Sequence, residues 1–196
     1  SSRATDMAMA DAEQFQPESL SDWHAWLEAH HDRGAGVWVV IWRASSGRQP
    51  LTYDGLVREA LCWGWVDGQA APLDDQRSKL WFKKRKPGSP WAASNKARVA
   101  ELEREGRLQP SGAAEIERAK ATGAWTLLDS VEALEVPPDL ATALDASAAA
   151  RTAWDGFPPG VRKQALGGVA LAKRAETRAS RIAAIVAKAE RGERPA

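Results

Sequence analysis

The segment Ala60-Leu61-Cys62-Trp63-Gly64-Trp65-Val66-Asp67-Gly68 joins a predicted helix to a predicted strand. Thr52 is a suitable N-cap for that helix. The apolar side chains after it recur at the spacing of one helix face: Tyr53, Leu56, Val57, Ala60 and Leu61. Gly64 can adopt the left-handed conformation that ends a helix, so the residues from Trp65 to Ala70 predict a strand.

Two further segments complete a small sheet. Val37–Arg43 is β-branched and aromatic throughout, which predicts a strand, and its two apolar faces place it centrally or covered on both sides. After an Asp-rich turn at 72–76, the residues from Lys79 to Lys84 predict a strand antiparallel to the one that begins at Trp65. The sequence therefore predicts a small antiparallel sheet.

The remaining segments read as helices. The first covers Ser19–His31, and from Ser89 onward helices follow one another to the end of the chain. The first of these begins after the N-cap Ser89 and ends at Gly106. The second covers 110–122, with Ser111 as a possible cap. The others are expected at Pro137 to Ser147, Pro158 to Ala172, and Glu176 to Glu190.

These elements predict an α+β fold, in which a small antiparallel sheet packs with helices and a helical C-terminal part follows. We expect residues 1–14 to form a flexible tail and 15–125 an α+β domain. Residues 126–196 are expected to form a helical C-terminal module packed on that domain.

Composition narrows the class of protein. The 27 Lys and Arg residues against 26 Asp and Glu give a net charge of +1, so general nucleic-acid binding through bulk charge is not expected. A single cysteine, Cys62, indicates a reducing compartment. The sequence contains no apolar run of membrane-spanning length. We therefore expect a soluble, cytoplasmic protein without membrane insertion, whose oligomeric state the sequence leaves open.

Several motifs resemble the bacterial family named bacteriocin-protection, YdeI/OmpD-associated (OmdA-like). They occur in order between Trp23 and Gly192. They are Glu59 to Gly68, Phe82-Lys83-Lys84-Arg85, Ser89 to Asn95, Glu105 to Leu108, Pro110-Ser111-Gly112, Ala119 to Trp125, Ala172 to Arg178, and Arg181-Ile182. The resemblance implies a stress or bacteriocin-protection role, and it implies no specific reaction.

Ten tryptophans in one chain indicate either a core filled with indoles or an aromatic-lined pocket. The pocket hypothesis places a small-molecule, peptide or protein ligand against Trp63, Trp65, Asp67, Arg85, Trp91 and Asn95. An alternative is an uncharacterised enzyme in the same cleft, with Asp67 as acid or base and Arg85 as anion clamp. The sequence carries no recognised catalytic motif, so the catalytic residues are unknown.

The last helix carries Arg174, Arg178 and Arg181 along one side, which indicates an anion-binding site or ion pairs with the acidic segment 129–145. A third hypothesis joins these arginines to the basic segment 83–86 as a nucleic-acid surface. The three histidines have no second ligand cluster, so neither a metal site nor a cofactor is predicted.

Overall fold

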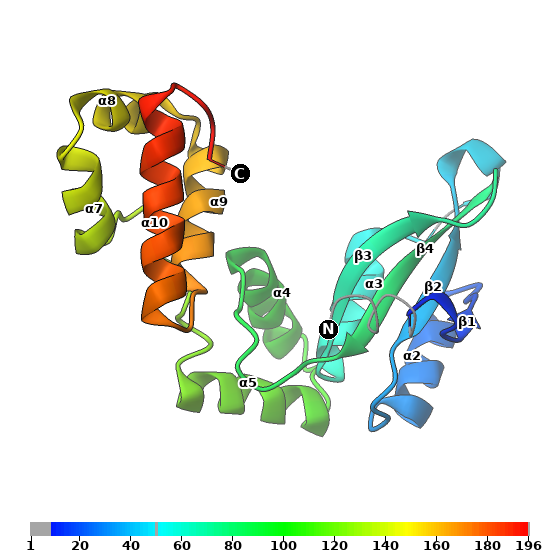
Figure 1. Ribbon diagram of the computed structural model, residues 1–196. Coiled ribbons are helices and arrows are strands. Elements are labelled where there is room, and N and C mark those ends of the chain that lie inside the picture. The colour runs from blue at the N-terminus through cyan, green and yellow to red at the C-terminus, as the bar shows by residue number, and fades with distance from the viewer. Residues whose placement is uncertain (1–8, 50, 196) are drawn as a thin grey trace. The chain divides into compact units, whose positions relative to one another are not determined.

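The computed structural model describes residues 9–49 and 51–195. The chain divides into two compact units. One, here called the sheet unit, comprises the residues up to Ser89 together with Ser94–Gly123. The other, the helical unit, comprises Pro90–Ala93 and the residues from Ala124 onward. The α+β class and the helical C-terminal part are confirmed (Figure 1).

The sheet unit is built on four strands in the order β1-β2-β4-β3. Their bounds are β1 Gln14–Phe15, β2 Val37–Trp42, β3 Trp65–Pro72 and β4 Arg77–Lys84. The central place predicted for Val37–Trp42 is confirmed, because β2 pairs in parallel with β1 and antiparallel with β4. The sequence did not predict β1. The first eight residues of the predicted tail lie outside the described residues.

Helices α2 (Leu20–His30) and α3 (Tyr53–Cys62) pack on one face of the sheet (Figure 1). The expected N-cap at Thr52 is confirmed, and Ser19 caps α2; each side chain accepts a hydrogen bond from a backbone N–H group of the first turn. The buried indole of Trp23 lies 5.2 Å from the ring of Phe82 on β4. Offset or tilted ring contacts of this kind contribute to the stability of the core beyond the apolar area they bury. A short 3₁₀ turn, η1 (Ala44–Ser46), follows β2.

Helices α4 (Ala93–Arg104) and α5 (Pro110–Thr122) follow the sheet. The predicted cap at Ser89 is wrong: α4 begins four residues later, and the Ser89 N–H donates to the Lys86 carbonyl in a turn. The late start of α4 has a tertiary cause: Trp91, which lies between Ser89 and α4, is buried. Its ring lies 4.9 Å from that of Trp125, and both residues belong to the helical unit. Ser111 is not a cap either, since its hydroxyl donates to the Trp63 carbonyl at 2.9 Å.

The helical unit consists of short helices around one apolar cluster. The bounds are α6 Asp129–Glu132, α7 Pro138–Asp145, α8 Ala148–Gly156, α9 Pro159–Ala170 and α10 Ala175–Glu190. The cluster includes the buried side chains of Leu140, Leu144, Trp154, Leu166, Ile182 and Ile185. The sequence did not predict α6 or α8. Among the described residues, no helix is long and apolar enough to cross a bilayer.

Candidate functional site

Trp63 and Trp65, the two tryptophans of the segment that joins α3 to β3, lie in the core of the sheet unit. Trp65 is fully buried, and its indole N–H donates to the His31 carbonyl at 2.9 Å. Trp63 is 6% exposed, and its ring lies 4.8 Å from that of His31 and 5.5 Å from that of His24. In the described part of the chain, neither indole is among the lining residues of four cavities, one beside β4 and three in the helical unit. Their main contribution is therefore to packing.

Asp67 accepts a hydrogen bond from the hydroxyl of Tyr53. Tyr53 was expected on the buried face of its helix, but it is 48% exposed. Tyr53 is the first residue of α3, and from this end of the helix its side chain extends to Asp67 on the edge strand β3. Burial of the hydroxyl, and next its hydrogen bond to Asp67, raise the pKa of Tyr53 to about 12. The pair joins α3 to the sheet.

Arg85 follows β4 and is only 5% exposed. Burial lowers the pKa of its guanidinium to about 10, and the charges of Glu115 and Asp67 oppose that shift. At neutral pH it remains a cation. Glu115 is itself buried and forms an ion pair with Arg118 at 2.9 Å. The backbone N–H of Arg85 donates to the Gly64 carbonyl at 3.0 Å, so the segment that ends α3 also fixes the residue after β4.

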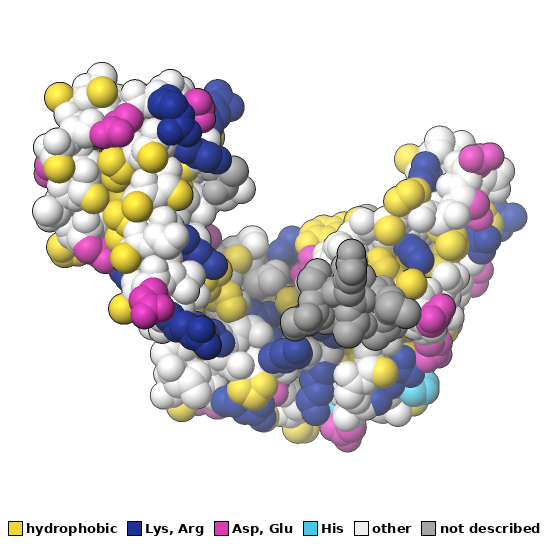
Figure 2. Space-filling model, in the orientation of Figure 1, with side chains coloured by type: hydrophobic (Ala, Val, Ile, Leu, Met, Phe, Trp, Pro, Cys, Tyr) yellow, Lys and Arg dark blue, Asp and Glu magenta, His cyan; other side chains and the backbone are white. Residues whose placement is uncertain are grey.

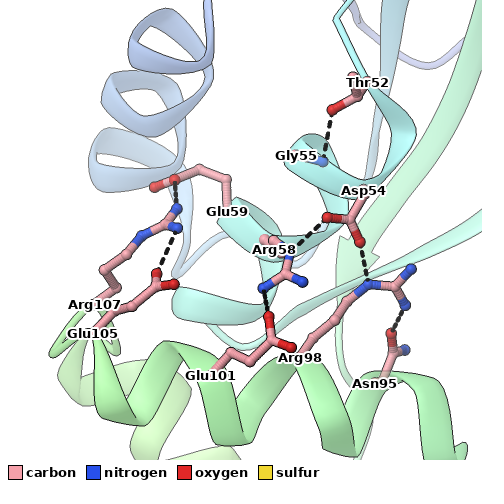
Figure 3. Close-up of polar contacts among 10 residues, drawn as sticks. All are labelled: Thr52, Asp54, Gly55, Arg58, Glu59, Asn95, Arg98, Glu101, Glu105 and Arg107. Atoms are coloured by element: carbon pink, nitrogen blue, oxygen red, sulfur yellow. Dashed lines mark hydrogen bonds and ion pairs between the residues drawn. The ribbon is translucent and has the colours of Figure 1, made fainter.

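Asn95 belongs to a polar network that fastens α4 to α3 (Figure 3). Its side-chain oxygen accepts from Arg98 at 2.8 Å, and the Nε of Arg98 donates to Asp54 at 2.8 Å. Asp54 also accepts from Arg58, which reaches Glu101 on α4 at 2.6 Å. These donors hold the pKa of Asp54 below its usual range. The charges of this network are matched within it. Trp91, the remaining predicted cleft residue, belongs to the helical unit.

A second cluster of the same kind surrounds the buried carboxylate of Glu59 (Figure 3). Glu59 accepts from Arg107 at 3.0 Å and from the Nδ1 side of His24. Cys62 lies one turn away, and burial, followed by the charge of Glu59, raises the pKa of its thiol to about 11. This thiol is therefore a poor nucleophile at neutral pH.

The three predicted arginines of α10 have different surroundings. Arg178 donates to both carboxylate oxygens of Asp139, at 2.6 and 2.9 Å, and thereby pairs with the acidic segment. Arg181 donates to the Gly168 carbonyl on α9. Arg174 is exposed at the N-cap position. Arg178 and Arg181 line different cavities, so the helix does not present the three as one cluster.

A hollow of about 810 Å³ lies on the side of the sheet opposite α2 and α3, and we call it the sheet hollow. Its volume is within the range of about 300–1,000 Å³ typical of ligand sites. Apart from Gly34 and Ala35 of the loop after α2, its lining residues are Met9, Ala12, Glu13, Arg33, Gly36, Gly68, Gln69, Trp81, Lys83 and Lys86.

Trp81 occupies this hollow because two glycines leave room for its ring. A Cβ on Gly36 would stand 2.2 Å from the indole, and a Cβ on Gly68 would stand 2.9 Å from it. Gly68 and Gln69 also lie at a register shift, since Asp67 pairs with Phe82 and Ala70 pairs with Leu80. Two residues of β3 therefore face one of β4, which is a β-bulge, and bulges are common beside active and binding sites.

The hollow carries excess positive charge. Each of the three guanidinium nitrogens of Arg33 has a partner. One forms an ion pair with Glu13 at 2.6 Å, and the other two donate to the carbonyls of Ala35 and Gly36 at 3.0 and 2.9 Å. Lys83 and Lys86 are exposed and form no ion pair with any described residue. The alternation of β4 places Lys84 on the opposite face, and Arg85 is buried. The basic segment 83–86 is thus not one continuous exposed row.

Sequence reasoning missed this site, although a signal was present. Lys79, Trp81 and Lys83 alternate along β4, so they share one face of the strand. The aromatic prediction instead followed Trp63 and Trp65. Among the described residues, no group of three or more His, Cys, Asp or Glu side chains is arranged to hold a metal ion.

The architecture is that of an α+β protein with a helical C-terminal unit, and comparison with known families agrees with this division. The chain belongs to the family described as Domain of unknown function (DUF8412), which matches residues 15–115. Residues 133–192 match the family described as Bacteriocin-protection, YdeI or OmpD-Associated (OmdA), a narrower extent than the sequence motifs suggested. The match to this family lies within the helical unit. No curated protein and no solved structure matches the chain.

Proposed function

We propose that the chain is a binding protein whose sheet hollow takes a small anionic ligand with a flat apolar part. The observation that carries this proposal is a pair of lysines, Lys83 and Lys86, that form no ion pair with the described part of the chain and line a cavity of ligand size together with Trp81. Uncompensated lysines attract an anion, and an indole provides an apolar surface for a ring.

The proposal places the ligand away from the predicted cleft. Trp63 and Trp65 line none of the cavities described above, whereas Trp81, although only 9% exposed, is among the lining residues of the sheet hollow. The charge of the hollow also selects the ligand, because Arg33 and Glu13 neutralise each other and the other charged residues in its described lining are the cations Lys83 and Lys86. A cationic peptide would meet like charge here. In a bacteriocin-protection role, the sheet unit would therefore bind an anionic molecule and not the toxic peptide itself.

The test uses two fluorescent probes with similar aromatic ring systems. The probe 8-anilino-1-naphthalenesulfonate is an anion, and N-phenyl-1-naphthylamine lacks the sulfonate. Titration of the full chain, read as energy transfer from tryptophan, is expected to show tighter binding of the sulfonate. Lys83→Gln is expected to weaken sulfonate binding about fivefold, the equivalent of about 1 kcal/mol for a partly exposed charge pair.

Lys84→Gln is the matched control, because it removes the same charge from the neighbouring residue on the other face of β4. It should leave the affinity for the sulfonate unchanged. If both lysine variants weaken binding equally, the effect is one of overall charge and the proposed site is wrong. Equal binding of the two probes to the unmodified chain would likewise exclude an anion site.

A further inference from the structure

The helical unit contains a cavity of about 390 Å³ beside α9 and α10 that the proposed function does not use. Its polar lining consists of Arg181 and Lys188 on α10 and Gln164 on α9. The apolar lining includes Ile185 and Pro195. The lining contains two cations and no acidic side chain.

The two cations lie on one side of α10, since residues seven apart are two helical turns apart. Arg181 is oriented by its hydrogen bond to the Gly168 carbonyl, which engages one of its five N–H groups. Neither Arg181 nor Lys188 forms an ion pair with any described residue. Glu193, which follows the helix, is held by Arg191 at 3.0 Å. Within residues 9–49 and 51–195, therefore, no salt bridge neutralises Arg181 or Lys188, although the charge of Lys188 acts on the Glu193 carboxylate.

Gly168 provides a second, independent observation. Glycine in a helix costs up to about 1 kcal/mol relative to alanine, and Gly168 lies in the last turn of α9 without the positive φ that would favour glycine there. A Cβ on Gly168 would meet no atom within 4 Å. No close contact requires glycine at this position. Its missing side chain leaves open the space in front of Arg181, where the cavity lies.

We propose that this cavity binds a small carboxylate that carries a short apolar chain. The carboxylate would bind between Arg181 and Lys188, because a guanidinium presents parallel N–H groups to two oxygens. The apolar chain would lie against Ile185 and Pro195. The site is separate from the sheet hollow, and the proposal does not rest on the function proposed for that hollow.

The experiment is an NMR titration of the full chain with hexanoate, hexanamide and inorganic phosphate, followed at the Gly168 amide and the Ile185 methyl groups. To silence the sheet hollow, every protein carries Lys83→Gln and Lys86→Gln. Hexanoate is expected to bind about tenfold more tightly than hexanamide, since a charge-assisted hydrogen bond contributes about that factor. Phosphate should bind more weakly than hexanoate, because it makes no use of the apolar walls.

Three variants complete the test. Arg181→Gln is expected to lower the affinity for hexanoate about tenfold, and Arg174→Gln, on the exposed end of the same helix, should not change it. Gly168→Leu fills the cavity and should abolish binding without lowering the melting temperature, because leucine is the better helix former. Equal affinities for hexanoate and hexanamide, or unchanged binding in Arg181→Gln, would overturn the proposal.

Discussion

The substitution Gly112→Ala tests how α5 is fixed to the end of α3. Gly112 is buried in α5, and a Cβ at this position would stand 2.2 Å from the carbonyl oxygen of Cys62 and 2.9 Å from that of Leu61. Both atoms belong to the backbone, so no side-chain rotation relieves the clash. The helix would have to move away by about 1 Å to reach an ordinary contact.

The magnitude follows from three terms. In an unobstructed helix, Gly→Ala stabilises by about 1 kcal/mol. Here the overpacking costs about 1–3 kcal/mol. Movement of α5 also stretches the hydrogen bonds from Gln109 N–H to the Cys62 carbonyl and from Ser111 to the Trp63 carbonyl, which contribute about 1 kcal/mol each. We expect a net destabilisation of the sheet unit by about 2 kcal/mol.

Hydrogen exchange measured by mass spectrometry separates the two units, because peptides from α3 and α5 report on one and peptides from α9 on the other. Gly112→Ala should speed exchange in α3 and α5 only. The control is Gly167→Ala in α9, where the added Cβ would meet only a Val131 methyl at 3.9 Å. Gly167→Ala should leave the stability of the helical unit unchanged or raise it, and exchange in α9 should not become faster. A Gly112→Ala protein with unchanged or slower exchange in α5 would refute the close approach.

Three further predictions concern titrating groups. Asp139→Asn removes the ion pair with Arg178 and should cost about 0.5–1 kcal/mol at neutral pH. Because Arg178 lowers the pKa of Asp139, this difference in unfolding free energy between the two proteins should shrink as the pH falls below about 4. Tyr53 is the chain's single tyrosine, so tyrosinate absorbance should report its pKa directly, near 12 and lower in Asp67→Asn. Since the folded-state pKa is raised, this group should stabilise the fold below about pH 10, and the contribution should disappear as the pH rises through 12. Cys62, with a pKa near 11, should react with a disulfide reagent at mildly alkaline pH about two orders of magnitude more slowly in the native protein than after denaturation.

The sequence signals that predicted the fold correctly are those in which the interacting groups lie within a few residues of one another along the chain. Gly64 has φ of 81°, the left-handed conformation that the end of a helix favours. Thr52 and Ser19 cap their helices with their own side chains. Ser89 failed as a cap because the burial of Trp91 outweighed a local preference worth about 1 kcal/mol. Helix α8 was missed because it buries only Ala150 and Trp154, so a single large apolar side chain marks its inner face.

The α10 arginines show where helical spacing stops being informative. Spacing predicted that Arg174, Arg178 and Arg181 would project along one side of the helix. It does not reveal which neighbouring helix lies beside each residue. Asp139 on α7 pairs with Arg178, and the Gly168 carbonyl on α9 accepts from Arg181. One predicted anion site therefore became an internal ion pair and a cavity whose second cation, Lys188, lay outside the predicted set.

Glycine explains why the alternation of Lys79, Trp81 and Lys83 along β4 was not enough to predict the sheet hollow. In a sequence, Gly36 and Gly68 look like turn residues, just as Gly64 does. In the structure they lie on either side of the Trp81 indole, and either Cβ would overlap with it. A glycine that ends a helix does so through its own backbone conformation, so its role can be predicted from the residues next to it in the sequence. A glycine that leaves room for a ring acts on a residue far along the chain, and only the register of β3 against β4 shows which ring that is. Because Trp81 and the two lysines depend on that register, the candidate site follows from the sheet and not from any single motif.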